Sequence, residues 1–399
     1  MKCTGIVVEY NPFHNGHLHH LRQSKTVTGS DIVAAVMSGN FLQRGEPAMI
    51  DKWTRANMAL AGGADIVIEL PYDFAVQKAD RFAFGAISLL EALRCDSFCF
   101  GSESGNVEAF GESAELLQAN EAEYNRNVRK LMKEGLSYPE AVSKAFSSIQ
   151  SGAPSFDITQ PNNILGFQYI LAARAIGSRM MPFTIPRKSA GYHDEHFADD
   201  SIASATSIRK SIRENGSASI QNFVPESTYK SLCLYEEENG LLHSWELYWP
   251  YLQYRLLTTS LPELNGICEI TEGIEYRLKE AAKKASSFRE FMTIVKTKRY
   301  TWTRIQRMCV HILTNAAKSD VGKHIRPQYI RLLGMSDAGR AYLNSIKKDL
   351  ELPLISRAAA GAEQAELDIR SSQVYALPLA AGLKKEFSQA PILYSNRLH

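Results

Sequence analysis

Two histidines three residues apart, His14 and His17, occur in the segment from Gly5 to His17, GIVVEYNPFHNGH. The apolar, β-branched residues before them predict a short strand over Thr4 to Tyr10, and the residues after them favour a helix. Side chains three apart at a helix start face the same side, and the free N–H groups there favour an anion. Imidazoles held at this point can donate hydrogen bonds to a triphosphate and stabilise the charge that develops when its α-phosphate is attacked. We therefore expect His14 and His17 to be catalytic residues of a nucleotide site.

The surrounding elements predict where that site lies. In the first half of the chain, apolar runs typical of buried strands alternate with helical patterns, which indicates parallel strands covered by helices on both faces. We therefore predict an α/β fold with a doubly wound, Rossmann-like parallel sheet, in which ligands bind at the carboxyl ends of the strands. After the first strand, the predicted strands are Asp31 to Met37, Asp65 to Leu70, Ser97 to Phe100 and Met181 to Ile185.

The second half of the chain has a different pattern. Beyond Gly216 the strand-like runs largely disappear and helical periodicity prevails, apart from one possible strand over Leu352 to Ser356. We predict an ATP-binding catalytic domain over 1–216 and a mainly α-helical domain over 217–399. Within the first domain, Val107 to Ser148 looks like a polar, helical insertion.

Composition restricts the class of protein. The 399 residues are 45% apolar and 22% charged with a net charge of +2, as in soluble globular proteins. The six cysteines form no CxxC pair and no Cys/His spacing suits a metal, so we expect reduced thiols and no metal site built by the protein. No run resembles a signal peptide or a membrane span, which favours a cytoplasmic protein without a membrane partner. The residues carry no signal for an oligomeric state.

One stretch of the second half is strongly basic. From Arg277 to Arg331 there are 14 Lys and Arg residues against three acidic ones, in a chain of net charge +2. Tyr300 and Trp302 are interleaved with these cations, and cations with exposed aromatic rings suit RNA phosphates and unstacked bases. A solvated helical face is the alternative for the charges, and a core position is the alternative for Trp302. The predicted RNA contacts are Lys296, Lys298, Arg299, Arg304 and Arg307.

Several blocks of sequence together resemble one known family. Beside the histidine segment, these blocks are SGNFLQRGEPAMIDKWTRANMAL (Ser38 to Leu60), FGSE (Phe100 to Glu103) and SATSIRK (Ser204 to Lys210). The chain thus resembles the bacterial tRNA(Met) cytidine acetate ligase family, an HxGH nucleotidyltransferase type, and the resemblance reappears over Lys298 to Arg307. The HxGH pattern alone fits many adenylyltransferases and class I aminoacyl-tRNA synthetases, whereas the QRGEP block is specific.

The resemblance implies a reaction. Such an enzyme activates acetate with ATP, as its Mg²⁺ complex, to give acetyl-adenylate and pyrophosphate. It then transfers the acetyl group to N4 of the wobble cytidine of elongator tRNA(Met), which yields N4-acetylcytidine and AMP. The resemblance also implies the ATP contacts, which are Val7, Val8, Glu9, Tyr10, Asn11, Pro12, Phe13, His14, Asn15, Gly16, His17, Leu18, His19, His20, Gly101, Asn162, Arg187 and Lys188.

The pattern of the residues supports several of these contacts. Three of the implied contacts follow predicted strands and are therefore expected at the ligand edge of the sheet: Gly101, Arg187 and Lys188. A pair of cations there suits phosphates, and the alternative for Arg187 and Lys188 is an exposed basic pair in a loop. Asn162 begins a predicted helix, so an N-cap role is as good an interpretation as a contact with the ligand. Five further residues are possible phosphate or acetate contacts, with solvated cations and a helix-capping serine as alternatives: Arg44, Lys52, Arg55, Ser207 and Arg209.

Two other functions compete with this hypothesis. A small-molecule adenylyltransferase of the HxGH class would join ATP to a phosphomonoester, but it would need no large basic helical region. A non-catalytic RNA-binding protein on a degenerate nucleotide fold would not need the intact histidine pair.

Overall fold

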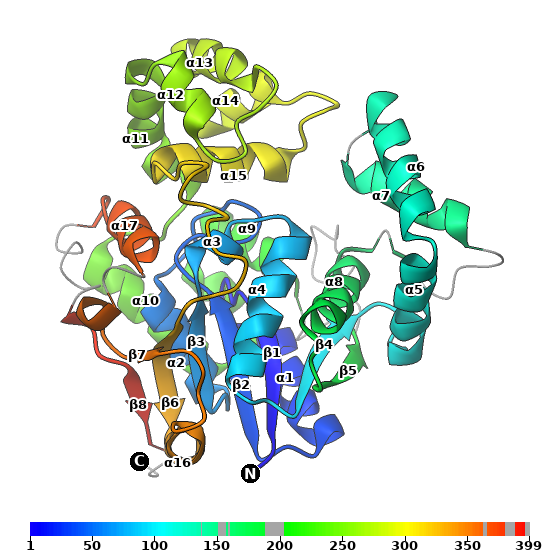
Figure 1. The fold of residues 1–399 in the computed structure, drawn as a ribbon. Coiled ribbons are helices and arrows are strands. Elements are labelled where there is room, and N and C mark those ends of the chain that lie inside the picture. Colours follow the sequence, from blue (N-terminus) through cyan, green and yellow to red (C-terminus); the bar gives the residue numbers. More distant parts are fainter. Residues whose placement is uncertain are drawn as a thin grey trace.

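The computed structural model describes residues 1–136, 138–150, 157–158, 160–187, 203–361, 365–379 and 388–395. Its centre is an eight-stranded sheet with the order β5-β4-β1-β2-β3-β6-β7, in which β8 pairs with β6 (Figure 1). The strands are β1 (Cys3–Val8), β2 (Ile32–Ser38), β3 (Ile66–Leu70), β4 (Ser97–Ser102), β5 (Met181–Pro186), β6 (Ile330–Ser336), β7 (Leu354–Ile355) and β8 (Ile392–Tyr394).

The first five strands are parallel to one another, as predicted. The chain places β2 and β3 on one side of β1 and then returns to place β4 and β5 on the other side. The sheet is therefore doubly wound, and its strand order reverses between β1 and β4. In open α/β sheets the ligand crevice lies at such a switch point, outside the carboxyl ends of the strands.

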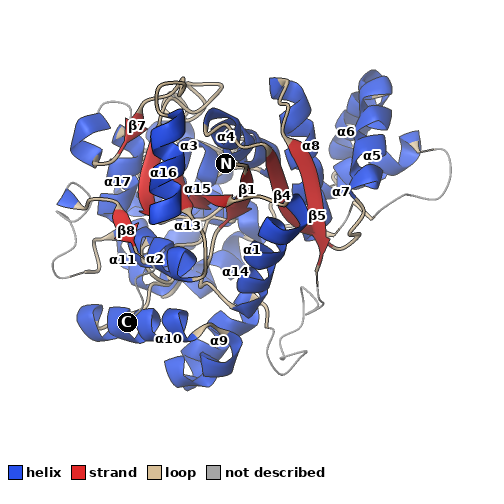
Figure 2. Ribbon diagram, turned by 90° about the horizontal axis from the view of Figure 1, so that it is seen from below, coloured by secondary structure: helices blue, strands red, loops and turns tan. Residues whose placement is uncertain are grey.

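Helices cover both faces of this sheet, as the view from below shows (Figure 2). The helices of the first half are α1 (Asn15–Thr28), α2 (Lys52–Ala61), α3 (Tyr72–Ala75), α4 (Ala79–Ala92), α5 (Val107–Ala119), α6 (Glu121–Lys133), α7 (Tyr138–Ile149), α8 (Pro161–Ile176) and α9 (Ala205–Asn215). In the second half they are η1 (Ser217–Phe223), α10 (Glu226–Asn239), α11 (Trp245–Thr258), α12 (Leu261–Gly266), α13 (Ile274–Lys284), α14 (Phe288–Val295), α15 (Trp302–Leu313), α16 (Asp337–Ile346), η2 (Ala358–Gly361) and α17 (Glu366–Tyr375).

Alternating side chains of the strands build a core on each face. Ala34 and Val36 of β2 pack with α4, α8 and α16, whereas Ala35 and Met37 pack with α1, α2, α9 and α10. Since both faces are covered, every residue of β2 is buried. This explains why the parallel strands read as continuous apolar runs in the sequence.

The helices α11 to α15 form a bundle whose core also includes Phe41, Tyr72, Val76 and Tyr375 from outside it. Figure 1 shows this bundle beyond the carboxyl ends of β1 to β3. After this bundle the chain returns to the sheet, because β6 pairs antiparallel with β3. The sequence reasoning did not predict β6, and the possible strand over Leu352 to Ser356 is reduced to β7. The division at residue 216 stays a prediction, and the structure adds that the last part of the chain extends the sheet.

The helical insertion predicted over Val107 to Ser148 is confirmed as α5, α6 and α7.

The six cysteines are free thiols. Within the described ranges, no helix has both the length and the apolar character that crossing a membrane requires.

Candidate active site

The histidine segment folds as a strand, a turn and a helix start. Tyr10 follows β1 by two residues and has a left-handed backbone with φ of 51°. His14 then caps α1: its Nδ1 accepts a 3.1 Å hydrogen bond from the N–H of Gly16, and its own N–H donates to Nδ1 of His17 at 3.4 Å. This reciprocal capping box satisfies N–H groups that the first helical turn leaves unpaired. The HxGH spacing therefore positions both imidazoles at the carboxyl end of β1.

The two imidazoles stack in a buried environment. Their ring centroids are 3.6 Å apart with an interplanar angle of 25°, and His14 is only 4% exposed. Burial lowers the pKa of His14 to about 3, and the nearby charges of Arg187 and Arg209 act in the same direction. Burial, followed by the neighbouring His14, also lowers the pKa of His17 well below its usual value. Both rings are thus neutral at neutral pH in the ligand-free protein.

The contact with Gly16 also determines which nitrogen of His14 carries the proton. Because Nδ1 accepts a hydrogen bond, the proton of the neutral ring is on Nε2, which is a donor suited to a phosphate oxygen. Three more polar atoms of the segment are buried and form no hydrogen bond with another described residue: Tyr10 Oη, Asn11 Nδ2 and His20 Nε2. Buried polar groups usually have partners, so the segment has polar groups available for a ligand.

The ends of β4 and β5 lie beside the histidine helix. A β-carbon at Gly101 would lie 3.5 Å from Cγ of Arg187 and 3.8 Å from the ring of His20, so these three predicted ATP contacts are neighbours. Arg187 also donates to Oδ1 of Asn162 at 2.7 Å. The structure therefore brings the predicted residues from β4, β5 and α8 to one place, and Lys188 lies outside the described residues.

Asn162 is held by a carboxylate that the sequence reasoning did not assign. Its Nδ2 donates to Glu103 at 2.6 Å, and the second oxygen of Glu103 accepts the N–H of Asn163 at 2.9 Å. The capping alternative for Asn162 is wrong, because Gln160 occupies the N-cap of α8. Glu103 instead binds the first turn of α8, where a negative charge is favoured, and orients Asn162 toward Arg187.

The start of α9 contributes Arg209 to the same region. This arginine donates to the carbonyl of Asn11 at 3.0 Å and to Glu46 at 3.3 Å. The capping alternative for Ser207 is wrong, because Ser204 is the N-cap and accepts the N–H of Ser207 at 3.1 Å. The hydroxyl of Ser207 donates to the carbonyl of the same cap residue at 2.8 Å, and the side chain is buried.

The QRGEP block packs against the end of β1. Oε1 of Glu9 accepts the N–H of Gln43 at 2.7 Å and the hydroxyl of Ser38 at 3.2 Å. Burial raises the pKa of Glu9, although the hydrogen bond from Gln43 and the charge of Arg44 oppose this effect. Burial in turn lowers the pKa of Arg44, with Glu9 opposing. A carboxylate and a guanidinium therefore lie close enough beside the histidine segment for each to influence the charge of the other.

The same block contacts the helical bundle. Trp245 of α11 donates its Nε1 hydrogen to the carbonyl of Gly45 at 2.9 Å. Gly45 has φ of +76°, and a β-carbon there would lie 2.3 Å from the backbone nitrogen of Arg307 in α15. The block therefore connects the end of β1 to the bundle through a close backbone approach that requires glycine.

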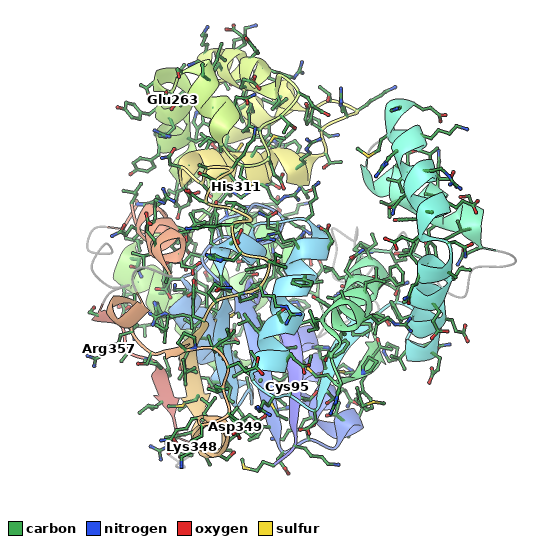
Figure 3. The ribbon with its side chains drawn as sticks, viewed as in Figure 1. Cys95, Glu263, His311, Lys348, Asp349 and Arg357 are labelled. Carbon is green, nitrogen blue, oxygen red and sulfur yellow. The ribbon has the colours of Figure 1, made fainter. Side chains whose placement is uncertain are left out.

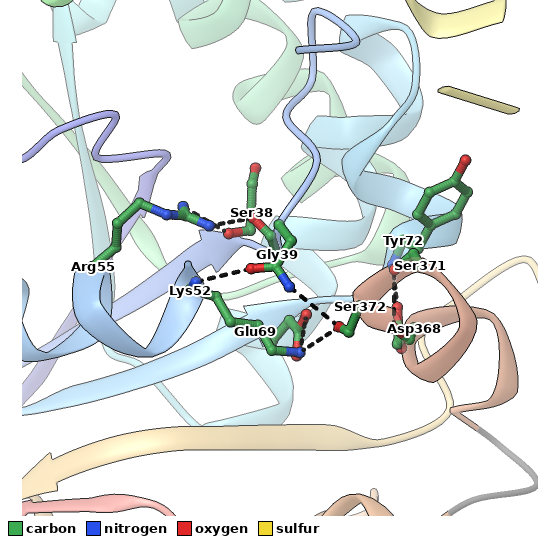
Figure 4. A network of polar contacts seen from close by, with 10 residues as sticks. Ser38, Gly39, Lys52, Arg55, Glu69, Tyr72, Asp368, Ser371 and Ser372 are labelled. Carbon is green, nitrogen blue, oxygen red and sulfur yellow. Dashed lines mark hydrogen bonds and ion pairs between the residues drawn. The ribbon is translucent and has the colours of Figure 1, made fainter. Parts of the chain in front are cut away.

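Lys52 and Arg55 are buried, so the solvated-cation alternative is wrong for both. Arg55 donates to the carbonyls of Glu9 at 2.7 Å and Ser38 at 3.1 Å, and also to those of Gly39 and Ile50. These contacts join the ends of β1 and β2, and Figure 4 shows those of Arg55 with Ser38 and Gly39.

Lys52 lies nearby in a separate ion pair. Its Nζ is 2.7 Å from Glu69 of β3 and 3.2 Å from the hydroxyl of Ser372 in α17. Asp368 of the same helix accepts the N–H of Tyr72 at 2.5 Å, so α17 is attached to the carboxyl side of the sheet (Figure 4). The protein thus supplies partners for both predicted cations, and their contact with acetate or phosphate stays a prediction.

The five predicted RNA contacts have different surroundings. Lys296 and Lys298 are exposed, and Arg299, also exposed, pairs with Glu272 at 2.8 Å. Arg304 lies over the ring of Tyr300 with its guanidinium carbon 4.7 Å from the centroid.

Arg307 is the buried member of this set. It is paired with Glu269 at 2.8 Å, and both side chains are largely shielded from solvent. Trp302 is 39% exposed, so its core alternative is wrong. The sequence reasoning missed Glu269 and Glu272 because both precede the basic stretch in which charges were counted.

Comparison with known proteins agrees with this geometry. Residues 1–390 match the family model of the HIGH nucleotidyl transferases. A tRNA(Met) cytidine acetate ligase of Lysinibacillus sphaericus is 50% identical over 98% of this chain and 100% of its own, and that of Bacillus subtilis is 46% identical over 99% and 98%. A crystal structure of Thermotoga maritima TmcAL bound with alpha-thio ATP has a TM-score of 0.91 and 34% identity over 99% of this chain and 100% of that chain. The chain belongs to the tRNA(Met) cytidine acetate ligase family of HIGH nucleotidyl transferases.

Proposed function

We propose that this protein activates acetate with ATP and transfers the acetyl group to N4 of the wobble cytidine of elongator tRNA(Met). The observation that carries the proposal is the neutral, stacked His14–His17 pair at the switch point of the sheet, of which His14 is buried. Membership of the family supports acetate as the acid that is activated and tRNA(Met) as the acceptor. The basic bundle beyond the same sheet edge gives a large surface that a small-molecule adenylyltransferase would not need.

In the first step, a carboxylate oxygen of acetate attacks the α-phosphorus of ATP, the bond to the β-phosphate breaks, and pyrophosphate leaves. The Nε2–H of His14 donates to a phosphate oxygen as its negative charge increases. His17, stacked on His14, is the second imidazole at the phosphates. Arg187 and Arg209 place two positive charges near the same histidines. These charges stabilise the negative charge that develops on the phosphate oxygens.

In the second step, N4 of cytidine attacks the acetyl carbon, the bond between that carbon and the phosphate oxygen of AMP breaks, and N4 loses a proton. The lone pair of this amine is delocalised into the ring, so a mixed anhydride is required as donor. The base must leave its stack to reach the adenylate.

We propose that ATP is bound by the segment from Val7 to His20 together with Gly101, Asn162, Arg187 and Lys188. Mg²⁺ enters as the ATP complex, because it usually keeps several waters and binds through substrate phosphates. Arg44 beside Glu9 is our candidate for orienting acetate. The bundle holds the tRNA through Lys296, Lys298, Arg299 and Arg304, with the strongest expectation for the exposed Lys296 and Lys298. Arg307 is left out of this proposal because it is buried in an ion pair with Glu269.

One assay tests the function. The protein is incubated with Mg²⁺, ATP, labelled acetate and unmodified tRNA(Met), and label is measured in N4-acetylcytidine after digestion. We expect label in tRNA that depends on ATP. Pyrophosphate release only with a phosphomonoester would support the small-molecule adenylyltransferase, and an absence of any ATP turnover would support a non-catalytic RNA-binding protein.

A further inference from the structure

A second basic surface lies on the helical insertion, far along the sequence from the basic bundle. Helix α6 carries Arg126, Arg129, Lys130 and Lys133 and has no acidic residue between Tyr124 and its end. Their spacing of three, one and three residues places the four cations on one face of the helix. All four side chains are exposed, and together with Glu134 they line an open hollow of about 440 Å³.

The opposite face of α6 holds the insertion together. Val128, with Tyr124 and Leu131 beside it, packs on Ala141 and Ala145 of α7. This small core does not involve the basic face, so the cations are not needed to fold the hairpin of α6 and α7. Removing them should therefore leave the insertion intact.

The cations of the basic face also have no partner within the protein. None of the four side chains forms a hydrogen bond or an ion pair with another residue of the described ranges. Nearby cations are neutralised, since Lys144 pairs with Glu140 at 3.4 Å and Arg174 pairs with Glu115 at 3.1 Å. Four clustered cations without an acidic partner produce a local positive potential, which attracts a negatively charged partner.

Geometry indicates which partner fits. Arg126 and Lys133 are separated by roughly 10 Å along the helix axis at 1.5 Å per residue. A row of cations of this length suits a chain of phosphates better than a single phosphate. Figure 1 shows that α6 and the bundle of α13 to α15 both extend beyond the carboxyl ends of the strands, the edge of the sheet at which the histidine segment lies.

We propose that the basic face of α6 binds the phosphate backbone of the tRNA while the bundle holds another part of the same molecule. This inference rests on the proposed function. The interaction adds affinity without reading sequence, because phosphates carry no base information. It also restricts the direction in which a bound tRNA leaves the active site.

The test compares two pairs of neighbouring cations in the full-length protein. The variant Arg129→Gln/Lys130→Gln changes the basic face, and Lys347→Gln/Lys348→Gln removes the same charge from the exposed end of α16. Figure 3 shows Lys348 at the opposite end of the molecule from α6. Binding of unmodified tRNA(Met) is measured at several salt concentrations, together with acetate-dependent ATP–pyrophosphate exchange.

We expect the α6 variant to bind tRNA about 10-fold more weakly at physiological salt, with a salt slope reduced by roughly 0.7 to 0.9 for each phosphate that is no longer neutralised. ATP–pyrophosphate exchange should be unchanged, and acetylation should show a higher KM for tRNA with an unaltered kcat. The charge-conserving variant Arg129→Lys/Lys130→Arg should bind like the wild type, and so should the α16 variant.

The inference is overturned if the α6 variant binds tRNA as tightly as the wild type, if the α16 variant loses as much affinity, or if anionic lipid vesicles bind to this face in preference to tRNA. Its failure is distinguishable from failure of the proposed function. Wild-type protein that acetylates tRNA while the α6 variant is normal overturns only the inference. Wild-type protein that shows α6-dependent tRNA binding but no acetylation overturns only the function.

Discussion

The histidine segment and the basic stretch of α14 to α15 are both conspicuous in the sequence, yet they differ in the structure. In the first, residues that are neighbours in the sequence remain neighbours in space, with His14 and His17 stacked at 3.6 Å. In the second, cations of one stretch have different surroundings: Lys298 is exposed, whereas Arg307 is buried against Glu269. A fixed short spacing is therefore a better guide to a site than a local excess of charge.

The physical reason is that only the histidine pattern determines how its side chains are held relative to the backbone. The HxGH spacing fixes the rings through a capping box that uses the first turn of α1, so the pattern itself carries geometry. A charge count carries none, because a helix distributes its side chains over all faces and the neutralising acids come from other segments. The following predictions test this difference.

Replacing Arg307 by Ala should have the largest effect, and on stability. Burial would raise the pKa of Glu269, but Arg307 holds it below its usual value, so the variant leaves a buried carboxylate without its partner. We expect a loss of about 3–5 kcal/mol in the free energy of unfolding, measured by urea denaturation, with Lys298→Ala as the control. A stable Arg307→Ala protein with weak tRNA binding would contradict this assignment and would restore the simple charge-count interpretation.

Replacing His14 by Asn separates capping from chemistry. Asparagine is a good N-cap, so α1 should keep its start, while the Nε2–H donor is lost. We expect acetate-dependent ATP–pyrophosphate exchange to fall about 10²- to 10³-fold, with thermal stability and tRNA affinity close to wild type. His17→Ala should be similarly inactive. If tRNA affinity fell as much as exchange, the histidines would be structural.

Much of the fold could be predicted because its parallel strands are buried on both faces. Ile32 to Met37 is an unbroken apolar run for that reason, and β1 to β5 were all predicted. Strand β6 was missed because Arg331 and Gly334 interrupt its apolar pattern. Both residues fit only through tertiary contacts: Arg331 lies over the ring of Trp53 at 5.5 Å, and a β-carbon at Gly334 would lie 2.7 Å from Leu60.

The residues of the candidate site likewise divide into those that the sequence predicted and those that depend on tertiary contacts. Gly101 and Arg187 were predicted from their positions after strands, and the structure places them together. The carboxylates Glu103 and Glu46 were not assigned, although both lie in sequence blocks that resemble the family. Their roles depend on Asn162 and Arg209, which are far away in the chain. Spacing within one segment cannot reveal such partners.

The lowered pKa of His14 predicts a smaller, pH-dependent effect. In the unfolded chain this histidine binds a proton as the pH falls through about 6.5, whereas in the folded protein it does so only near 3. The unfolded state therefore binds more protons between these values, and stability falls as the pH is lowered through that window. We expect His14→Asn to reduce this slope by up to about 1.4 kcal/mol per pH unit in ligand-free protein, measured by urea denaturation from pH 7 to 4. An unchanged slope would mean that His14 is solvated and able to charge.

The smallest expected effect concerns two exposed cations of the same basic stretch. Lys298 is exposed with no ion pair to another described residue, whereas Arg299 is 2.8 Å from Glu272. Lys298→Ala should weaken tRNA binding about 4-fold at physiological salt and reduce the salt slope by roughly 0.7. Arg299→Ala should have less effect, because Glu272 already offsets its charge. Titrations at several salt concentrations measure both variants. Equal losses would show that the ion pair opens when RNA binds, and then local charge would again be as informative as local geometry.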